Sequence, residues 1–418
     1  MDPRLEEDAK IHSCHPNDAV VPVWTDIVYD ILARVHDTTG INTIGCFRIG
    51  SDMDRLRCPP TVLVGIDRQV FRDWKVVREA IVSALNSRGL ESVGVRIRKD
   101  KKPRRANNIE RNPIQPSDCR PDPPLGYSLG PHNMKDAIGT LRGWVELKSP
   151  RTGQWVSFAI TCTHCCLPPR GALNDEDQEI LWKWKQEGVR FGDPDAARLL
   201  SVDAPCYRDI KAGIDAKESL IDVTKADHAY RRVEGARAQG RSSSSGDQEG
   251  WKRASDFPST SDPSKLSVRD WALVQPKSGR SAGENDIGTL SGFLHRRHVG
   301  QFKTALPPKD EKVYKIGRVS GFTSGQFGAL QSCSLENETK NGHTVSRQTW
   351  EHVVTQPSGA FLELGDSGSL LFDANGDVLG MLFGASDKGD ISYFTATADL
   401  LQDIKSITGA LDVRLKQA

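Results

Sequence analysis

Leu364-Gly365-Asp366-Ser367-Gly368-Ser369-Leu370-Leu371-Phe372 is the stretch on which the interpretation of this chain depends. It sets a serine between two glycines, with an aspartate before the serine and an apolar run after it. Because glycine adopts backbone conformations closed to other residues, we expect a tight turn that exposes the Ser367 hydroxyl and leaves nearby N–H groups pointing together. A nucleophilic hydroxyl and convergent N–H donors are two requirements of acyl transfer. The alternative is a glycine-rich hairpin in which Ser367 only caps a turn.

The bulk composition narrows the class of protein. A chain of 418 residues predicts roughly two or three domains. Its 56 basic and 55 acidic residues give a net charge of +1, which predicts no general attraction to nucleic acid or membranes. No apolar run approaches the roughly 20 residues that cross a bilayer. Residues 1–10 are acidic and polar, so we expect no signal peptide and a cytoplasmic location, with a nuclear one as the alternative.

The cysteines do not form the pattern of a disulfide framework. There are nine, an odd number, and Cys162, Cys165 and Cys166 crowd together. None follows Cys333. This usage predicts free thiols in a reducing compartment.

The first part of the chain predicts a disordered tail over residues 1–20 and a small α/β domain over residues 21–100. Helical spacing of apolar residues begins at Trp24, and Asp73 is placed to cap a second helix. The domain contains no phosphate loop, metal set or acid–base pair, so we expect it to pack or to bind a regulatory partner. A basic, proline-rich linker follows over residues 101–124. We expect this linker to be solvated; a nuclear-import or nucleic-acid patch is the less favoured alternative.

The remainder, residues 125–418, reads as many short strands separated by turns, which predicts a closed β-barrel or a pair of barrels. One strand ends at Cys162-Thr163-His164-Cys165-Cys166, and another opens with Asp270-Trp271-Ala272-Leu273. An insertion over residues 171–262 interrupts the strands. We expect it to be mostly helical, with a flexible part over residues 236–262.

A histidine at a strand end, an aspartate on a strand and a turn serine therefore occur in the order His164, Asp270, Ser367. With the motifs Thr161-Cys162-Thr163-His164-Cys165, Asp270-Trp271-Ala272-Leu273 and Gly365-Asp366-Ser367-Gly368-Ser369, the chain resembles the trypsin-like (chymotrypsin-fold) serine peptidases. Subtilisin and the α/β-hydrolases have different orders. The resemblance covers about residues 125–410 without the insertion. It implies a mainly β fold with two six-stranded barrels, preceded here by the small α/β domain.

The resemblance also implies a role for each motif residue. Ser367 is expected to attack a peptide carbonyl, His164 to carry the proton, and Asp270 to orient the imidazole. The backbone N–H groups of Gly365 and Ser367 are expected to bind the oxyanion. No cofactor and no metal are expected.

Substrate-binding residues follow less directly from the resemblance. The family's pocket floor lies six residues before the serine, at Phe361, and we expect Phe361, Leu362, Phe383 and Gly384 to contact substrate. Phe361 and Leu362 are apolar, and core positions are their alternative. No acidic floor is present, so the sequence does not support a preference for Lys or Arg.

Three departures and alternatives remain open at this stage. Cys165 matches one half of a family disulfide, but no cysteine occurs around Gly139–Leu147 to supply the other half. In many secreted members of the family, the aspartate before the serine pairs with a new N-terminus. No activation sequence is evident here, so Asp366 needs another partner or has a role in the backbone turn. A metal site of His164 with its neighbouring cysteines is disfavoured, since residues one apart on a strand point to opposite faces.

The leading hypothesis is a serine endopeptidase that acts on a protein or peptide substrate and is regulated by the N-terminal domain and the insertion. The chief alternative is a catalytically weak or inactive binding or regulatory module on a peptidase fold. A third possibility is an effector that cuts a single partner, or itself in the flexible loop. We expect no membrane partner.

Overall fold

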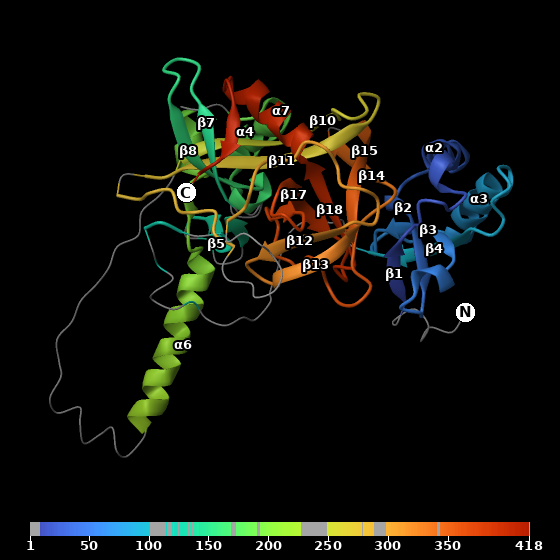
Figure 1. Ribbon diagram of the computed structural model, residues 1–418, viewed down its shortest axis with the longest axis horizontal. Coiled ribbons are helices and arrows are strands. Elements are labelled where there is room, and N and C mark those ends of the chain that lie inside the picture. The colour runs from blue at the N-terminus through green and yellow to red at the C-terminus, as the bar shows by residue number, and fades with distance from the viewer. Residues whose placement is uncertain are drawn as a thin grey trace.

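The fold is described from a computed structural model of the chain (Figure 1). The structure describes residues 9–100, 114, 119, 121–123, 125–132, 134, 138–141, 143–168, 173–189, 193–226, 249–277, 279–287, 298–340 and 343–417. Most of the predicted linker and the first half of the predicted flexible loop lie outside these residues. None of the helices in the described part is long and apolar enough to cross a membrane.

The N-terminal domain is a small sheet covered by two helices, as the sequence predicts. Strand β2 pairs antiparallel with β1 and β3, and β3 pairs parallel with β4. A parallel pair needs a crossover, which α3 supplies. Asp73 caps α3 by accepting a hydrogen bond from the Lys75 N–H, as expected. The elements are β1 Lys10–Ser13, α2 Trp24–Arg34, β2 Ile41–Gly50, β3 Pro60–Ile66, α3 Trp74–Asn86 and β4 Gly94–Lys99, with 3-10 helices Val21–Val23 and Arg55–Arg57.

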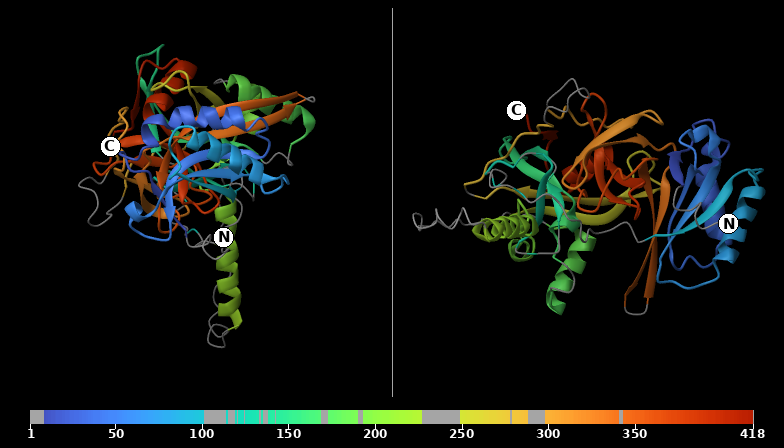
Figure 2. Two further views of the ribbon diagram at one scale, coloured as in Figure 1. Left: turned by 90° about the vertical axis from the view of Figure 1, so that its right-hand side faces the viewer. Right: turned by 90° about the horizontal axis from the view of Figure 1, so that it is seen from below.

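A long hairpin, β14 Ser332–Lys340 with β15 His343–Thr355, joins this domain to the rest of the molecule. Strand β14 pairs antiparallel with β2, so the N-terminal sheet continues into the hairpin. The Trp24 indole N–H also donates to the Gln331 carbonyl over 2.8 Å. Figure 2 shows the N-terminal domain at one end of the molecule, with the hairpin alongside it. The domain is therefore held to the rest of the molecule by strand pairing.

The C-terminal strands form a closed ring of six in the order β13-β12-β16-β17-β18-β15, with β15 returning to pair with β13. Closure removes every free edge from the ring. Its interior is an apolar cluster that includes Phe361, Leu371, Leu382 and Phe394. The further elements are β12 Lys312–Gly317, β13 Gly321–Phe327, β16 Leu370–Phe372, β17 Val378–Ala385, β18 Ile391–Ala396 and helix α7 Thr397–Thr408.

The middle of the chain forms a second group of strands against this ring. Its main path is β19-β7-β8-β11, and β10 pairs along β11; β5 pairs with β6 and β9. One apolar core runs through both groups. The mainly β fold expected from the sequence is confirmed, and the ring described above is one closed six-stranded barrel. The elements are β5 Tyr127–Pro131, β6 Gly139–Leu141, β7 Gly143–Lys148, β8 Trp155–Thr161, a 3-10 helix Thr163–Cys166, β9 Val202–Asp203, β10 Glu249–Pro258, β11 Leu266–Gln275 and β19 Val413–Leu415.

Two boundaries predicted from the sequence are wrong. The tail predicted over residues 1–20 contains β1, whose four residues pair with β2. The insertion predicted over residues 171–262 ends before β10, because β10 pairs with β11 along all of its length. The rest of the insertion does contain the expected helices, α4 Asp175–Glu187, α5 Pro194–Leu199 and α6 Tyr207–Ala226.

Candidate functional site

His164 lies where a strand ends and a short 3-10 helix begins. Strand β8 ends at Thr161, and the chain turns at once into the 3-10 helix Thr163–Cys166. The Thr163 hydroxyl donates to the Trp271 carbonyl over 2.6 Å, which ties this turn to β11. Strand β11 is itself anchored, since the Trp271 indole N–H donates to Asp403 of α7 over 2.7 Å. The turn therefore stands in a fixed position beside Asp270.

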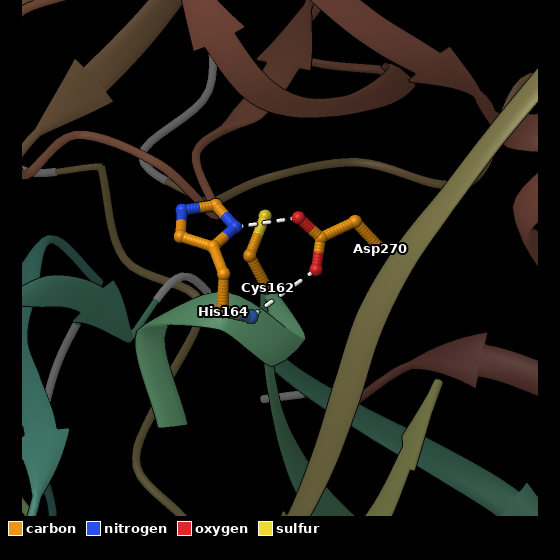
Figure 3. Close-up of side chains that lie close together, drawn as sticks. All are labelled: Cys162, His164 and Asp270. Carbon is orange, nitrogen blue, oxygen red and sulfur yellow. Dashed lines mark hydrogen bonds and ion pairs between the residues drawn. The ribbon is translucent and has the colours of Figure 1, made fainter. Parts of the chain in front are cut away.

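Asp270 holds His164 by two bonds, one to the ring and one to the backbone (Figure 3). The distance from His164 Nδ1 to Asp270 Oδ2 is 2.5 Å, and the His164 backbone N–H donates to Oδ1 over 3.2 Å. Because a carboxylate accepts at Nδ1, the ring proton belongs on Nδ1 and Nε2 is left as an acceptor. Only 12% of the His164 side chain and 11% of the Asp270 side chain are exposed.

The electrostatics of the ring follow from its neighbours. Burial alone would lower the pKa of His164, but the negative charges of Cys165 and Asp270 outweigh it and raise that pKa above its ordinary value. A hydrogen bond from the Cys162 thiol, together with the His164 cation, lowers the pKa of Cys165. These charges therefore stabilise the imidazolium that forms once Nε2 of His164 has accepted a proton.

The turn that carries Ser367 needs both of its glycines. Gly365 has φ 102° and Gly368 has φ 92°, which is the left-handed region that disfavours side chains. A Cβ on Gly368 would lie 2.7 Å from the Thr161 hydroxyl, so the turn packs tightly on the end of β8. The Gly368 N–H donates to the Leu382 carbonyl over 2.8 Å, which fixes the turn to β17.

Ser367 lies beside the His164 turn without bonding to the imidazole. Its hydroxyl donates to the Phe383 carbonyl over 3.3 Å. Its carbonyl accepts from the Thr140 N–H over 3.2 Å and lies 3.6 Å from the sulfur of Cys165. In the described part of the chain, no hydrogen bond joins Ser367 to His164. The structure therefore pairs the predicted histidine with the predicted aspartate and places the predicted serine next to them.

The predicted oxyanion donors are available. Among the described residues, neither the Gly365 N–H nor the Ser367 N–H donates to a protein acceptor. The Gly365 carbonyl is held by the Thr140 hydroxyl over 2.7 Å. Two backbone donors of one turn are thus left for an acceptor from outside the protein.

Asp366 has the internal partner that the sequence left open, and that partner is Lys315. The distance from Lys315 Nζ to Asp366 Oδ2 is 2.8 Å, and both side chains are fully buried. The carboxylate also accepts from the Val319 N–H over 2.6 Å and from the Ser320 hydroxyl over 2.5 Å. A Cβ on Gly317 would lie 2.2 Å from Asp366, so this position needs glycine. The sequence signal for Lys315 is a lysine inside an otherwise apolar strand, and sequence reasoning missed it.

The four predicted substrate residues divide into two pairs. Phe361 and Leu362 are buried in the core of the six-stranded ring, in keeping with the alternative stated for them. Phe383 presents its carbonyl to Ser367 while its ring stacks on Tyr393 at 6.5 Å between centroids. Gly384 follows it at a register shift of β17. Of these four residues, Phe383 is the one whose bond to the serine is shown.

The residue that faces Cys165 is a glycine, which leaves no room for a second cysteine side chain. All nine cysteines are free. Gly139 of β6 faces Cys165, and a Cβ on Gly139 would lie 2.3 Å from the Cys165 Cβ. No second cysteine side chain fits there without movement of the backbone.

The stated reason against a metal site is wrong. Ligand atoms of Cys162, His164 and Asp270 all lie within 4.8 Å of one another (Figure 3). The opposite-face rule holds for adjacent residues, whereas Cys162 and His164 are separated by Thr163, a spacing that keeps two side chains on one face even of a strand. The donors that converge here are a thiol, an imidazole and a carboxylate, a set that suits zinc or cadmium.

Comparisons with known proteins were made for the whole chain. No family model and no curated protein matches it. Among solved structures, it is similar to Nocardiopsis protease at 14% identity, covering 70% of this chain and 98% of that chain with a TM-score of 0.33. It is also similar to Thermobifida fusca protease A at 13% identity, with the same coverage and TM-score. A glutamic acid specific serine protease matches at 14% identity over 70% of this chain and 100% of its own, with a TM-score of 0.34. These solved structures are trypsin- or chymotrypsin-like serine proteases.

Proposed function

We propose that this chain is a serine endopeptidase that hydrolyses peptide bonds through an acyl-enzyme. The observation that carries the proposal is the 2.5 Å bond between His164 Nδ1 and Asp270 Oδ2, next to a strained turn that carries Ser367. This bond leaves Nε2 as the nitrogen that can accept a proton. The two unpaired N–H groups of the turn complete the set that acyl transfer uses.

The chemistry divides into two stages. In the first, Ser367 Oγ attacks the substrate carbonyl carbon while His164 Nε2 takes the hydroxyl proton. The carbonyl oxygen becomes an oxyanion that accepts from the Gly365 and Ser367 N–H groups. The carbon–nitrogen bond then breaks, His164 returns its proton to the leaving amine, and an ester to Ser367 remains. In the second stage water repeats the sequence and releases the acid.

One movement is required before the first stage. The Ser367 hydroxyl must leave the Phe383 carbonyl and rotate toward His164 Nε2. Catalytic hydrogen bonds are often long or absent before substrate binds, and a bound substrate strand that takes the Phe383 carbonyl as its own acceptor would release the hydroxyl.

The proposed substrate is a protein or peptide, with no preference for Lys or Arg on the N-terminal side of the cut bond. Phe361 occupies the position of the family's pocket floor, and its ring lies in the apolar core of the six-stranded ring. No carboxylate is supplied from this position to meet a basic side chain.

A second candidate function is a binding or regulatory module of the same fold with little activity. The observation in its favour is that Ser367 bonds to Phe383 and not to His164. In this reading the serine turn is a rigid recognition surface. The two functions differ in whether the hydroxyl can be acylated or phosphonylated.

A fluorophosphonate probe distinguishes them, because it labels only an activated serine. We expect wild type to be labelled, Ser367→Ala to be unlabelled, and the exposed turn serine control Ser358→Ala to be labelled like wild type. Equal labelling of wild type and Ser367→Ala contradicts the peptidase proposal. Absence of label from wild type supports the binding module. The intact mass of wild type against Ser367→Ala then tests self-cleavage.

A further inference from the structure

The loop of residues 386–390, which joins β17 to β18, touches the segment that leads to the candidate nucleophile. The Gly389 carbonyl accepts from the Phe361 N–H over 2.9 Å, and the Asp390 carbonyl accepts from the Gln356 N–H over 3.0 Å. A Cβ on Gly389 would lie 2.6 Å from both the Ala360 Cβ and the Leu362 carbonyl oxygen. The loop therefore lies in close contact with residues 360–362 and determines where they can sit.

The other side of the same loop is held by the N-terminal domain. Asp100, just after β4, accepts from the Asp387 N–H at Oδ1 over 2.8 Å. Arg98 of β4 bridges two carboxylates, at 2.9 Å from Asp390 Oδ2 and 2.9 Å from Asp100 Oδ2. Arg68 pairs with Asp387 at 2.5 Å. Every one of these bonds except that between Arg98 and Asp100 joins the N-terminal domain to the loop.

The contacts of Arg98 and Asp100 are largely shielded from water, whereas Arg68 is 52% exposed. The exposed fractions of the Arg98, Asp100 and Asp390 side chains are 20%, 11% and 12%. Burial raises the pKa of Asp100, and the Arg98 charge opposes that rise. Shielded, multiply bonded charges of this kind fix geometry more than they add stability.

The loop is internally rigid, so it moves as one piece. The Ser386 hydroxyl donates to Asp390 Oδ1 over 2.5 Å, and the Gly389 N–H donates to the Ser386 carbonyl over 2.9 Å. Gly389 takes φ 67°, which closes the turn. A displacement of Asp387 or Asp390 should therefore also displace Gly389, whose carbonyl accepts from the Phe361 N–H.

We propose that Arg98 and Asp100 of the N-terminal domain are positioning residues for the candidate active site, which set the 386–390 loop and through it the buried segment 360–362 that leads to Ser367. The N-terminal domain is then part of the structure that holds the Ser367 turn. This inference rests on the proposed peptidase function. It goes beyond that function, because none of the residues 21–100 takes part in the chemistry.

The inference is tested in the full-length chain with Arg98→Met, which keeps much of the apolar stem and removes the charge. Arg88→Met is the matched control, since Arg88 pairs with Asp30 at 2.6 Å within the same domain. We expect Arg98→Met to lower kcat/KM for a peptide substrate about tenfold or more, because a small misplacement of a catalytic group is costly. We expect the rate of fluorophosphonate labelling to fall as well. Arg98→Lys should restore part of both.

Hydrogen exchange gives a readout that does not depend on activity. In Arg98→Met we expect faster exchange in peptides that contain the Phe361 and Asp387 amides, and unchanged exchange in α3 and β3. Asp100→Asn keeps the shape of the side chain and should speed hydrogen exchange in the same peptides. It replaces Arg98→Met in this test if that variant folds poorly. Arg88→Met should leave them as in wild type.

The outcomes separate the two proposals. Unchanged kcat/KM and labelling rate, together with unchanged exchange at these peptides, overturn the inference, and so does a uniform rise of exchange over the whole chain. If wild type shows no turnover or labelling, the peptidase proposal fails, and local exchange still decides whether Arg98 and Asp100 hold the loop.

Discussion

Lys315 and Asp366 form a fully buried ion pair, 2.8 Å from Nζ to Oδ2, directly before the candidate nucleophile. The carboxylate also accepts from the Glu363 N–H over 3.2 Å, which lies in the segment leading into the turn. Lys315 is thus the partner of Asp366 that the sequence analysis left open, and it comes from within the chain. The turn is organised without any cleavage of the chain.

Lys315→Met should therefore destabilise the protein and reduce labelling by fluorophosphonates. Removing one partner of a buried pair leaves an uncompensated charge, which costs about 3–5 kcal/mol. Chemical denaturation measures the free energy of unfolding. The rate of fluorophosphonate labelling measures the reactivity of Ser367, which depends on the conformation of its turn.

The matched control is the double variant Lys315→Met, Asp366→Asn, which removes the stranded charge. We expect it to recover much of the stability and little of the labelling rate, because an amide cannot replace all the bonds that Asp366 accepts. A single Lys315→Met variant with wild-type stability and labelling would contradict the positioning role of the pair.

Asp270→Asn should keep the fold and lose nearly all activity. The amide oxygen can still accept from the His164 backbone N–H, but an amide presented to Nδ1 favours the wrong imidazole tautomer. For a Ser-His-Asp site this substitution lowers kcat by about 10⁴. Peptide hydrolysis and thermal unfolding, measured together, separate the two effects.

Asp262→Asn is the control for that experiment, since Asp262 is a 44% exposed carboxylate that pairs with Lys265 at 3.6 Å. It should behave like wild type. A loss of less than about tenfold in Asp270→Asn would remove Asp270 from the proposed mechanism.

Short sequence motifs predicted each of the three candidate catalytic residues. The glycines around Ser367, the strand that ends before His164 and the aspartate on an apolar strand are each visible within a few residues, and the structure places them together. The Lys315 partner was not predictable in this way, because it joins residues 51 apart and needs the ring of strands to be known.

Three other failures have physical causes. Strand β1 is only four residues long, too short to show a hydrophobic pattern, so its order comes from pairing with β2. The convergence of Cys162 with His164 was missed because the opposite-face rule concerns adjacent residues, and Thr163 separates these two. The Arg98 contact was missed since it spans 292 residues between two domains.

Acid should weaken the fold through His352. This side chain packs against Phe327 and Phe394, with ring centroids at 6.1 and 5.5 Å. Burial, aided by Lys265 and opposed by Asp399, lowers the pKa of His352 from 6.5 to about 4. Between these pH values the unfolded chain binds a proton that the folded chain excludes, so stability falls as pH drops from 6.5 to 4. The loss is at most about 3 kcal/mol.

His352→Phe should remove this part of the pH dependence, because phenylalanine does not titrate and fits an aromatic neighbourhood. Urea unfolding at several pH values measures it as the difference between wild type and variant. Parallel pH curves for the two proteins would show that His352 does not contribute.

Cadmium should inhibit the proposed activity through Cys162. Ligand atoms of Cys162, His164 and Asp270 lie within 4.8 Å of one another, and small inward movements bring such donors to metal-bonding distance. An ion that takes His164 Nδ1 displaces the proton directed at Asp270 and separates the pair. We expect inhibition of labelling to be reversed by EDTA, and Cys162→Ala to need about tenfold more cadmium or higher for the same inhibition.

The control for cadmium is Cys206→Ala, because Cys206 is also fully buried and burial raises its pKa to about 12. It should be inhibited like wild type. A thiolate-to-cadmium absorption band that is present in Ser367→Ala and lost in the Cys162→Ala, Ser367→Ala double variant would locate the ion without any use of activity. Equal sensitivity of wild type and Cys162→Ala would mean that Cys162 does not bind the metal, since a set of ligands that loses a thiolate cannot keep the same affinity for a soft cation.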